Sequence, residues 1–112
     1  VLYLPDDEDH EIGLLYAYYL IKKAGHECIY LGPSVPVIDV GECCMNSNAT
    51  AVLCTFTIPR HDDVLNTYLN KMKAVCPSVK LLVHGLPSHI DSQLNDSQFN
   101  FLYDLQDLKN II

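Results

Sequence analysis

Short, nearly continuous apolar runs alternate along the whole chain with segments of helical periodicity, and this alternation limits the possible folds more than any other feature. Two of the runs, residues 51–56 (AVLCTF) and 79–83 (VKLLV), flank a segment whose apolar residues recur at helical spacing. Strands that are apolar at almost every position are typical of parallel sheets with both faces covered. The alternation therefore predicts an α/β fold built on a parallel sheet.

The expected elements follow this alternation through all 112 residues. Strands are expected at residues 1–4, 28–31, 51–56, 79–83 and 99–103. Helices are expected at residues 12–24, about 36–45, about 62–75 and 104–112. Asp62 or Asp63 is expected to cap the third of these helices, and a single helical turn is expected near 88–94 in a polar loop. Five such units predict one flavodoxin-like (Rossmann-type), doubly wound domain over residues 1–112 with a five-stranded parallel sheet.

The charge of the chain argues against several classes of function. The formal net charge is −7, with only seven basic residues. Phosphate backbones and anionic membranes are held chiefly by Lys and Arg, so this chain is not expected to grip DNA or a membrane by itself. No apolar stretch approaches the roughly 20 residues of a membrane span, and no signal peptide is visible. The sequence does not begin with Met, so we expect a domain of a longer protein. We expect that protein to be cytoplasmic.

Four loops are expected to meet at the edge of the sheet formed by the carboxyl ends of its strands, where doubly wound folds bind ligands. They comprise residues 5–13, 32–36, 55–60 and 84–88. The first loop is the richest in chemistry, because four acidic residues and His10 follow one another there. Its three aspartates are interpreted as solvated charges favoured by the dipole of the next helix.

Two other interpretations of the acidic loop, a receiver domain and a metal site, require residues that the sequence lacks. A phosphoryl-accepting receiver domain would use Asp6 and Asp7 to hold a divalent cation, but its third strand must end in an acceptor Asp. Here that strand runs into TFT (55–57), and no Lys follows the fifth strand before Lys109. The loop also lacks the glycine turn and bidentate Glu of an EF-hand, and no nearby His or Cys completes a zinc site.

The spacing Glu8-x-His10-x-x-Gly13 carries a family resemblance. The stretches EDHEIG, GHECIYLG and a following VP resemble the cobalamin-binding domain of light- and B12-responsive transcriptional regulators of the MerR type. They are also similar to the cobalamin domains of methionine synthase and corrinoid proteins, in which the first motif position is usually Asp. The resemblance covers nearly the whole chain, and the ExHxxG loop after the first strand is its specific part.

This resemblance implies that cobalamin is bound base-off, with His10 as the axial ligand of cobalt. Imidazole suits such a metal, and a ligating imidazole commonly gives its other N–H to a carboxylate, which Glu8 could supply. Gly13 would let the bulky cofactor approach the backbone where the helix begins. The nucleotide tail would lie in a slot beside the sheet.

Two further motifs are implied to line that slot. Thr55 and Thr57 match a Ser/Thr motif after the third strand, and Thr55 is a candidate hydrogen-bond donor to the tail. His84 and Gly85 stand where the resemblance leads one to expect Gly-Gly after the fourth strand, so an imidazole replaces the first glycine.

The expected protein is therefore the C-terminal sensory domain of a MerR-type transcriptional regulator that binds adenosyl- or methylcobalamin, and it is not expected to be an enzyme. DNA would be contacted only by an upstream domain, and the full-length protein is expected to form a homo-oligomer. Two alternatives stay open: a corrinoid-carrier module of a methyltransferase, and a regulator domain that has lost its cofactor.

Overall fold

Five parallel strands form one sheet in the computed structural model, which describes residues 1–112 apart from the side chain of Ser92. The strands are β1 (Leu2–Tyr3), β2 (Tyr30–Gly32), β3 (Ala51–Thr55), β4 (Lys80–His84) and β5 (Phe99–Leu102). Their order across the sheet is β2-β1-β3-β4-β5, and every neighbouring pair is parallel. This is the flavodoxin-like order with its switch point between β1 and β3, so the predicted fold class is confirmed.

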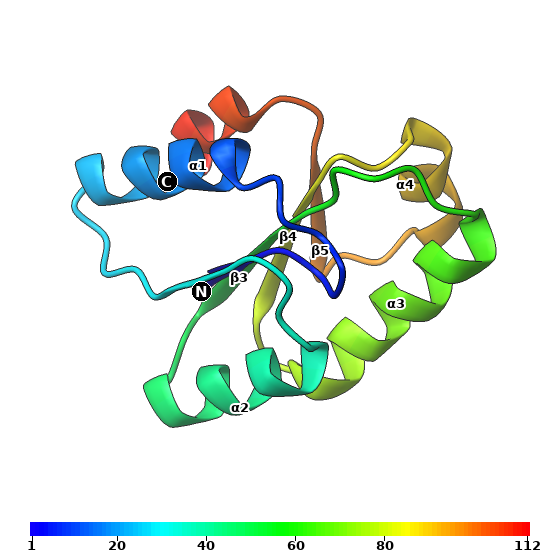
Figure 1. The fold of residues 1–112 in the computed structure, drawn as a ribbon, viewed down its shortest axis with the longest axis horizontal. Coiled ribbons are helices and arrows are strands. Elements are labelled where there is room, and N and C mark those ends of the chain that lie inside the picture. The colour runs from blue at the N-terminus through cyan, green and yellow to red at the C-terminus, as the bar shows by residue number, and fades with distance from the viewer.

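Helices cover both faces of the sheet. The helical elements are α1 (Ile12–Lys23), α2 (Val37–Ser47), α3 (Asp62–Val75), α4 (Ser88–Leu94) and the 3-10 helix η1 (Leu105–Asn110). In Figure 1, α1 and the C-terminal segment lie together over one face, and α2 and α3 lie along the other. Among the described residues, no helix is long and apolar enough to cross a bilayer.

Each face of the sheet has its own apolar core. Leucines of β1, β3, β4 and β5 pack against α1 and η1 on one face. Tyr3, Val52 and Cys54 belong to the opposite core, which includes side chains of α2 and α3. Because successive strand residues point to opposite faces, Thr55 follows Leu53 on the α1 side of β3.

Gly41 lies in the middle of α2, where glycine weakens a helix, and its role becomes clear from the packing. A Cβ at this position would lie 2.8 Å from Cβ and 2.9 Å from the carbonyl oxygen of Val75. The missing side chain therefore lets α2 approach the end of α3, an interhelical contact that single-residue propensity does not reveal.

The predicted elements are confirmed, with differences at three helices. Residues 88–94 form a seven-residue helix rather than a single turn, between Pro87 and the left-handed Asn95. His61, not Asp62 or Asp63, occupies the N-cap position of α3, and it makes no side-chain cap hydrogen bond. The C-terminal segment is a 3-10 helix rather than an α-helix, and Asp104 caps it by accepting from the backbone of Gln106.

Candidate ligand site at the carboxyl edge of the sheet

The predicted convergence of loops at the carboxyl edge is confirmed by hydrogen bonds between them. The backbone N–H of Ser34 donates to the carbonyl of Glu8 over 2.9 Å, and the N–H of Asp7 donates to the Ser34 hydroxyl over 3.1 Å. The N–H of Phe56 donates to the carbonyl of His84 over 2.8 Å. The loops after β1 and β2 are thus joined to each other, as are those after β3 and β4.

Glu8 is fully buried, and both of its carboxylate oxygens have partners. Oε1 accepts from the backbone N–H of Thr57 over 2.6 Å and from the Thr57 hydroxyl over 2.7 Å. Oε2 accepts from the Arg60 guanidinium over 2.8 Å. We call Glu8, Thr57 and Arg60 the Glu8 cluster. It ties the loop after β1 to the loop after β3, next to the switch point of the sheet.

Arg60 was not among the residues predicted for the site. Its guanidinium also donates to the carbonyl of Asp6 over 3.2 Å and lies 5.5 Å from the centre of the Phe56 ring. The sequence contained a signal for this role, because Arg60 is the only arginine in an acidic chain and follows the third strand. A buried carboxylate is stable only when it is paired with a positive charge or accepts several hydrogen bonds, and Arg60 supplies the positive charge here.

His10 lies on the same loop but makes no hydrogen bond with the Glu8 cluster. Its side chain is 77% exposed, and Nδ1 lies 3.8 Å from a carboxylate oxygen of Asp9. The expected pairing of Glu8 with the His10 ring is absent, because Thr57 and Arg60 occupy both Glu8 oxygens. The imidazole is therefore uncommitted and open to an external metal. Among the described residues, no group of three His, Cys, Asp or Glu side chains is placed to hold a metal ion.

Gly13 faces the C-terminal 3-10 helix. A Cβ at this position would lie 3.4 Å from Cδ1 of Leu105, which is an ordinary contact distance. Leu105 itself is buried in the core beneath α1 and η1. The open face of Gly13, which was predicted to admit a ligand, is thus covered by the Leu105 side chain.

Thr55 and His84 form the second polar group of this edge. They are register partners at the ends of β3 and β4. Thr55 is only 2% exposed, and neither its Oγ1 nor Nδ1 of His84, which is also buried, has a hydrogen-bond partner. Burial lowers the pKa of His84, and the charge of Asp104 opposes part of that shift. We call these two residues the Thr55–His84 pair.

Glycine is needed at position 85 because the backbone of Phe56 lies too close for a side chain, and not because an open slot lies there. Its φ is +93°, a conformation that favours glycine, and a Cβ there would lie 2.0 Å from the carbonyl oxygen of Phe56. The glycine that follows His84 therefore lets the loops after β3 and β4 run in contact with each other.

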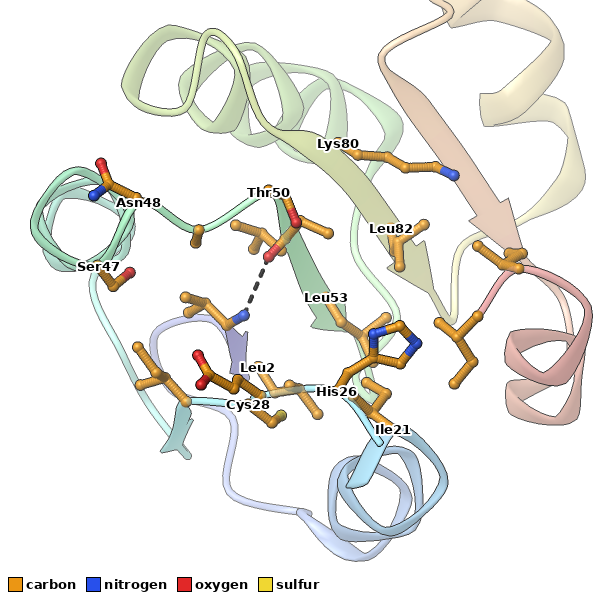
Figure 2. Close-up of a pocket in the computed structure, with 18 residues that line it drawn as sticks. Leu2, Ile21, His26, Cys28, Ser47, Asn48, Thr50, Leu53, Lys80 and Leu82 are labelled. Carbon is orange, nitrogen blue, oxygen red and sulfur yellow. Dashed lines mark hydrogen bonds between the residues drawn. The ribbon is translucent and has the colours of Figure 1, made fainter. Parts of the chain in front are cut away.

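A cavity of about 490 Å³ lies at the opposite, amino edge of the sheet. Figure 2 shows Leu2, Leu53, Leu82, His26 and Lys80 among the residues that line it. The amino group of Val1 also lies in this region and donates to the carbonyl of Ala51 over 3.1 Å. The predicted site residues all lie elsewhere, at the carboxyl edge, where doubly wound sheets bind their ligands.

Comparison with known proteins agrees with this architecture. No protein-family profile matches the sequence, and no curated protein matches it either. Among solved structures, the crystal structure of a novel cobalamin-binding protein from Desulfitobacterium hafniense DCB-2 is similar, with a TM-score of 0.78 and 19% sequence identity. The two proteins share a fold. The similarity covers 98% of this chain and 55% of that one, so this chain spans about half the length of its structural neighbour.

Proposed function

We propose that this chain binds cobalamin at the carboxyl edge of its sheet, in the base-off form, with His10 as the axial ligand of cobalt. The observation that carries the proposal is the exposed, uncommitted imidazole of His10 after β1, in a fold shared with a cobalamin-binding protein. Neutral imidazole is a common ligand for transition metals, and no other side chain competes for this ring at hydrogen-bond distance.

The residues at the edge fit the proposed cofactor in a second respect. The buried Thr55 hydroxyl lacks a partner, so a nucleotide tail placed on the α1 side of the sheet would satisfy it. Leu105 would have to withdraw from Gly13 for a ligand to reach that position. A bound corrinoid would supply a cobalt centre, whose adenosyl form is sensitive to light.

Glu8 has a different role in this proposal from the one the motif implies. It does not orient the His10 ring in this structure but holds the loop that carries His10 against Thr57 and Arg60. The Glu8 cluster therefore fixes the backbone position of the axial ligand and leaves its ring free to turn toward an incoming metal.

The role we propose is regulatory: a cytoplasmic sensory domain of a MerR-type transcriptional regulator, in which cobalamin binding changes the oligomeric state. The net charge of −7 supports DNA contact through another domain rather than through this one. No catalytic role is proposed. Light scattering of the cobalamin-loaded protein, in the dark and after illumination, tests the change of oligomeric state.

Cobalamin binding itself is tested by visible absorption. The purified protein is mixed with hydroxocobalamin or adenosylcobalamin, desalted and compared with His10→Ala and with His26→Ala. His26 is the matched control, because it is an exposed histidine at the opposite edge of the sheet. We expect retained pigment with a histidine-ligated spectrum in the native protein and in His26→Ala, and its loss in His10→Ala.

Retention that is independent of His10 would contradict the proposed axial ligand, and absence of retention in every form would contradict cobalamin binding. The second outcome would favour a domain that has lost its cofactor, for which the contact between Leu105 and Gly13 is the supporting observation. A corrinoid carrier of a methyltransferase would instead show the same spectra without a change of oligomeric state on illumination.

A further inference from the structure

Thr55 and His84 are register partners on adjacent strands, and each carries a buried polar atom without a hydrogen-bond partner. Residues directly opposite each other in adjacent strands point to the same face, so both side chains project to the α1 side of the sheet. The residues that precede them on that face, Leu53 and Leu82, belong to the leucine-rich core under α1 and η1. Buried polar groups nearly always have partners, so these two atoms are available to hydrogen-bond an added group.

The pair can both donate and accept hydrogen bonds. A threonine hydroxyl has one proton and two lone pairs, and a neutral imidazole has one N–H and one acceptor nitrogen. Burial lowers the pKa of His84 and so favours the neutral ring, while the charge of Asp104 opposes this shift. The pair therefore suits a planar, neutral group that carries several hydrogen-bonding atoms along one edge.

The lower bases of corrinoids differ in this property. Dimethylbenzimidazole has a single ring nitrogen free for hydrogen bonding and two methyl groups that need apolar space. A purine base has several acceptor nitrogens along its edge, carries an amino group in the case of adenine, and lacks the methyl groups. An imidazole where the resemblance predicts glycine takes away room for methyl groups and adds hydrogen-bonding capacity.

We propose that the Thr55–His84 pair recognises the lower base of a corrinoid and that His84 makes this chain prefer a purine base over dimethylbenzimidazole. The inference rests on the proposed binding of a corrinoid and deepens it by assigning the chemical class of its tail. His84 acts as a specificity-determining residue, and Thr55 as a hydrogen-bonding partner common to both kinds of tail.

The test measures affinity by absorbance titration of the purified protein with three corrinoids. These are adenine-tailed cobamide, cobalamin, and cobinamide, which lacks the nucleotide. We expect the adenine-tailed form to bind about tenfold more tightly than cobalamin, since leaving a buried polar group unpaired costs about that factor. Cobinamide should bind through His10 alone and more weakly than either.

Three variants locate the effect. His84→Gly should remove the preference by restoring room for the methyl groups, and His84→Asn should retain part of it because the amide still hydrogen-bonds. Thr55→Val should weaken both tailed corrinoids about equally and leave cobinamide unchanged. His26→Ala, at the other edge of the sheet, should change none of the three affinities.

The outcomes separate the inference from the function on which it rests. Failure of all three corrinoids to bind, cobinamide included, would overturn the proposed function and the inference together. Binding that depends on His10, with equal affinity for the two tails in the native protein or with an unchanged preference in a folded His84→Gly or His84→Asn variant, would overturn the inference alone. Circular dichroism of each variant establishes that it is folded.

Discussion

Two polar clusters lie at the same edge of the sheet and differ in how their buried atoms are satisfied. In the Glu8 cluster, a fully buried carboxylate accepts three hydrogen bonds from Thr57 and Arg60. In the Thr55–His84 pair, a buried hydroxyl and a buried ring nitrogen have no partner. The Glu8 carboxylate is thus satisfied within the protein, although Nε of Arg60 has no partner, whereas neither buried atom of the Thr55–His84 pair is satisfied.

The difference separates a carboxylate that is satisfied within the protein from two polar atoms for which we propose a ligand. Burying a charge is tolerated when it is paired, so the Glu8 cluster can hold two loops together without a ligand. A buried hydroxyl without a partner destabilises the unliganded protein, and a fold retains such a group where binding recovers the loss. Substitutions in the two clusters should therefore have opposite effects on stability.

The largest expected effect follows removal of the cation from the Glu8 cluster. Arg60→Met should lower the free energy of unfolding by about 3 kcal/mol, because it leaves the carboxylate of Glu8 buried and without its charged partner. Urea denaturation measures this change. The matched control is Lys73→Met, which removes the exposed pair of Lys73 with Asp96 and should cost less than about 1 kcal/mol.

A second substitution shows whether the loss comes from the unpaired charge. Adding Glu8→Gln to Arg60→Met should recover part of the lost stability, since a neutral amide is less costly to bury than an unpaired carboxylate. Equal stability of the single and double variants would mean that Arg60 acts through its packing on Phe56 instead.

The sequence was sufficient to predict the fold and the edge that carries the site. The apolar runs at 51–56 and 79–83 lie in β3 and β4 with small shifts at their ends, because a strand covered on both faces leaves a continuous apolar signal. The 3-10 form of the last helix was not predicted. A six-residue segment leaves too few periodic positions to distinguish it from an α-helix.

Side-chain partners at the edge were harder to predict than the edge itself. Spacing alone placed Glu8 next to His10, but the carboxylate turns toward residues about fifty positions later in the chain. Local sequence spacing contains no information about which of several loops supplies the partner. Likewise, Leu105 covers Gly13 from the far end of the chain, a contact that only the folded backbone reveals.

The next largest effect is expected at Thr57. Thr57→Val removes the hydroxyl that donates to Glu8 but keeps the backbone N–H bond, so the free energy of unfolding should fall by about 1.5 kcal/mol. Thermal and urea unfolding measure the change. An unaltered stability would show that Arg60 and the backbone are enough to satisfy the Glu8 carboxylate.

The same substitution at Thr55 should have the opposite sign. Thr55→Val removes a buried hydroxyl without a partner and keeps the shape of the side chain, so the unliganded protein should become more stable by roughly 1 kcal/mol. Urea denaturation of the Thr55→Val and Thr57→Val variants side by side gives the comparison directly. Destabilisation at both positions would mean that the Thr55 hydroxyl has a partner in solution, such as a bound water.

The smallest effect is expected from the titration of His84. Its pKa in the folded protein lies below the ordinary value of 6.5, so the unfolded chain takes up the proton first as the pH falls. The contribution of His84 to stability is therefore complete above pH 6.5 and is lost progressively below it. Urea denaturation between about pH 5 and 8 should show a shallower loss in His84→Asn than in the native protein, since every other ionisable group is common to both. A steeper loss in the variant would mean that pairing with Asp104 outweighs burial, and His84 would then belong with the satisfied groups of the edge.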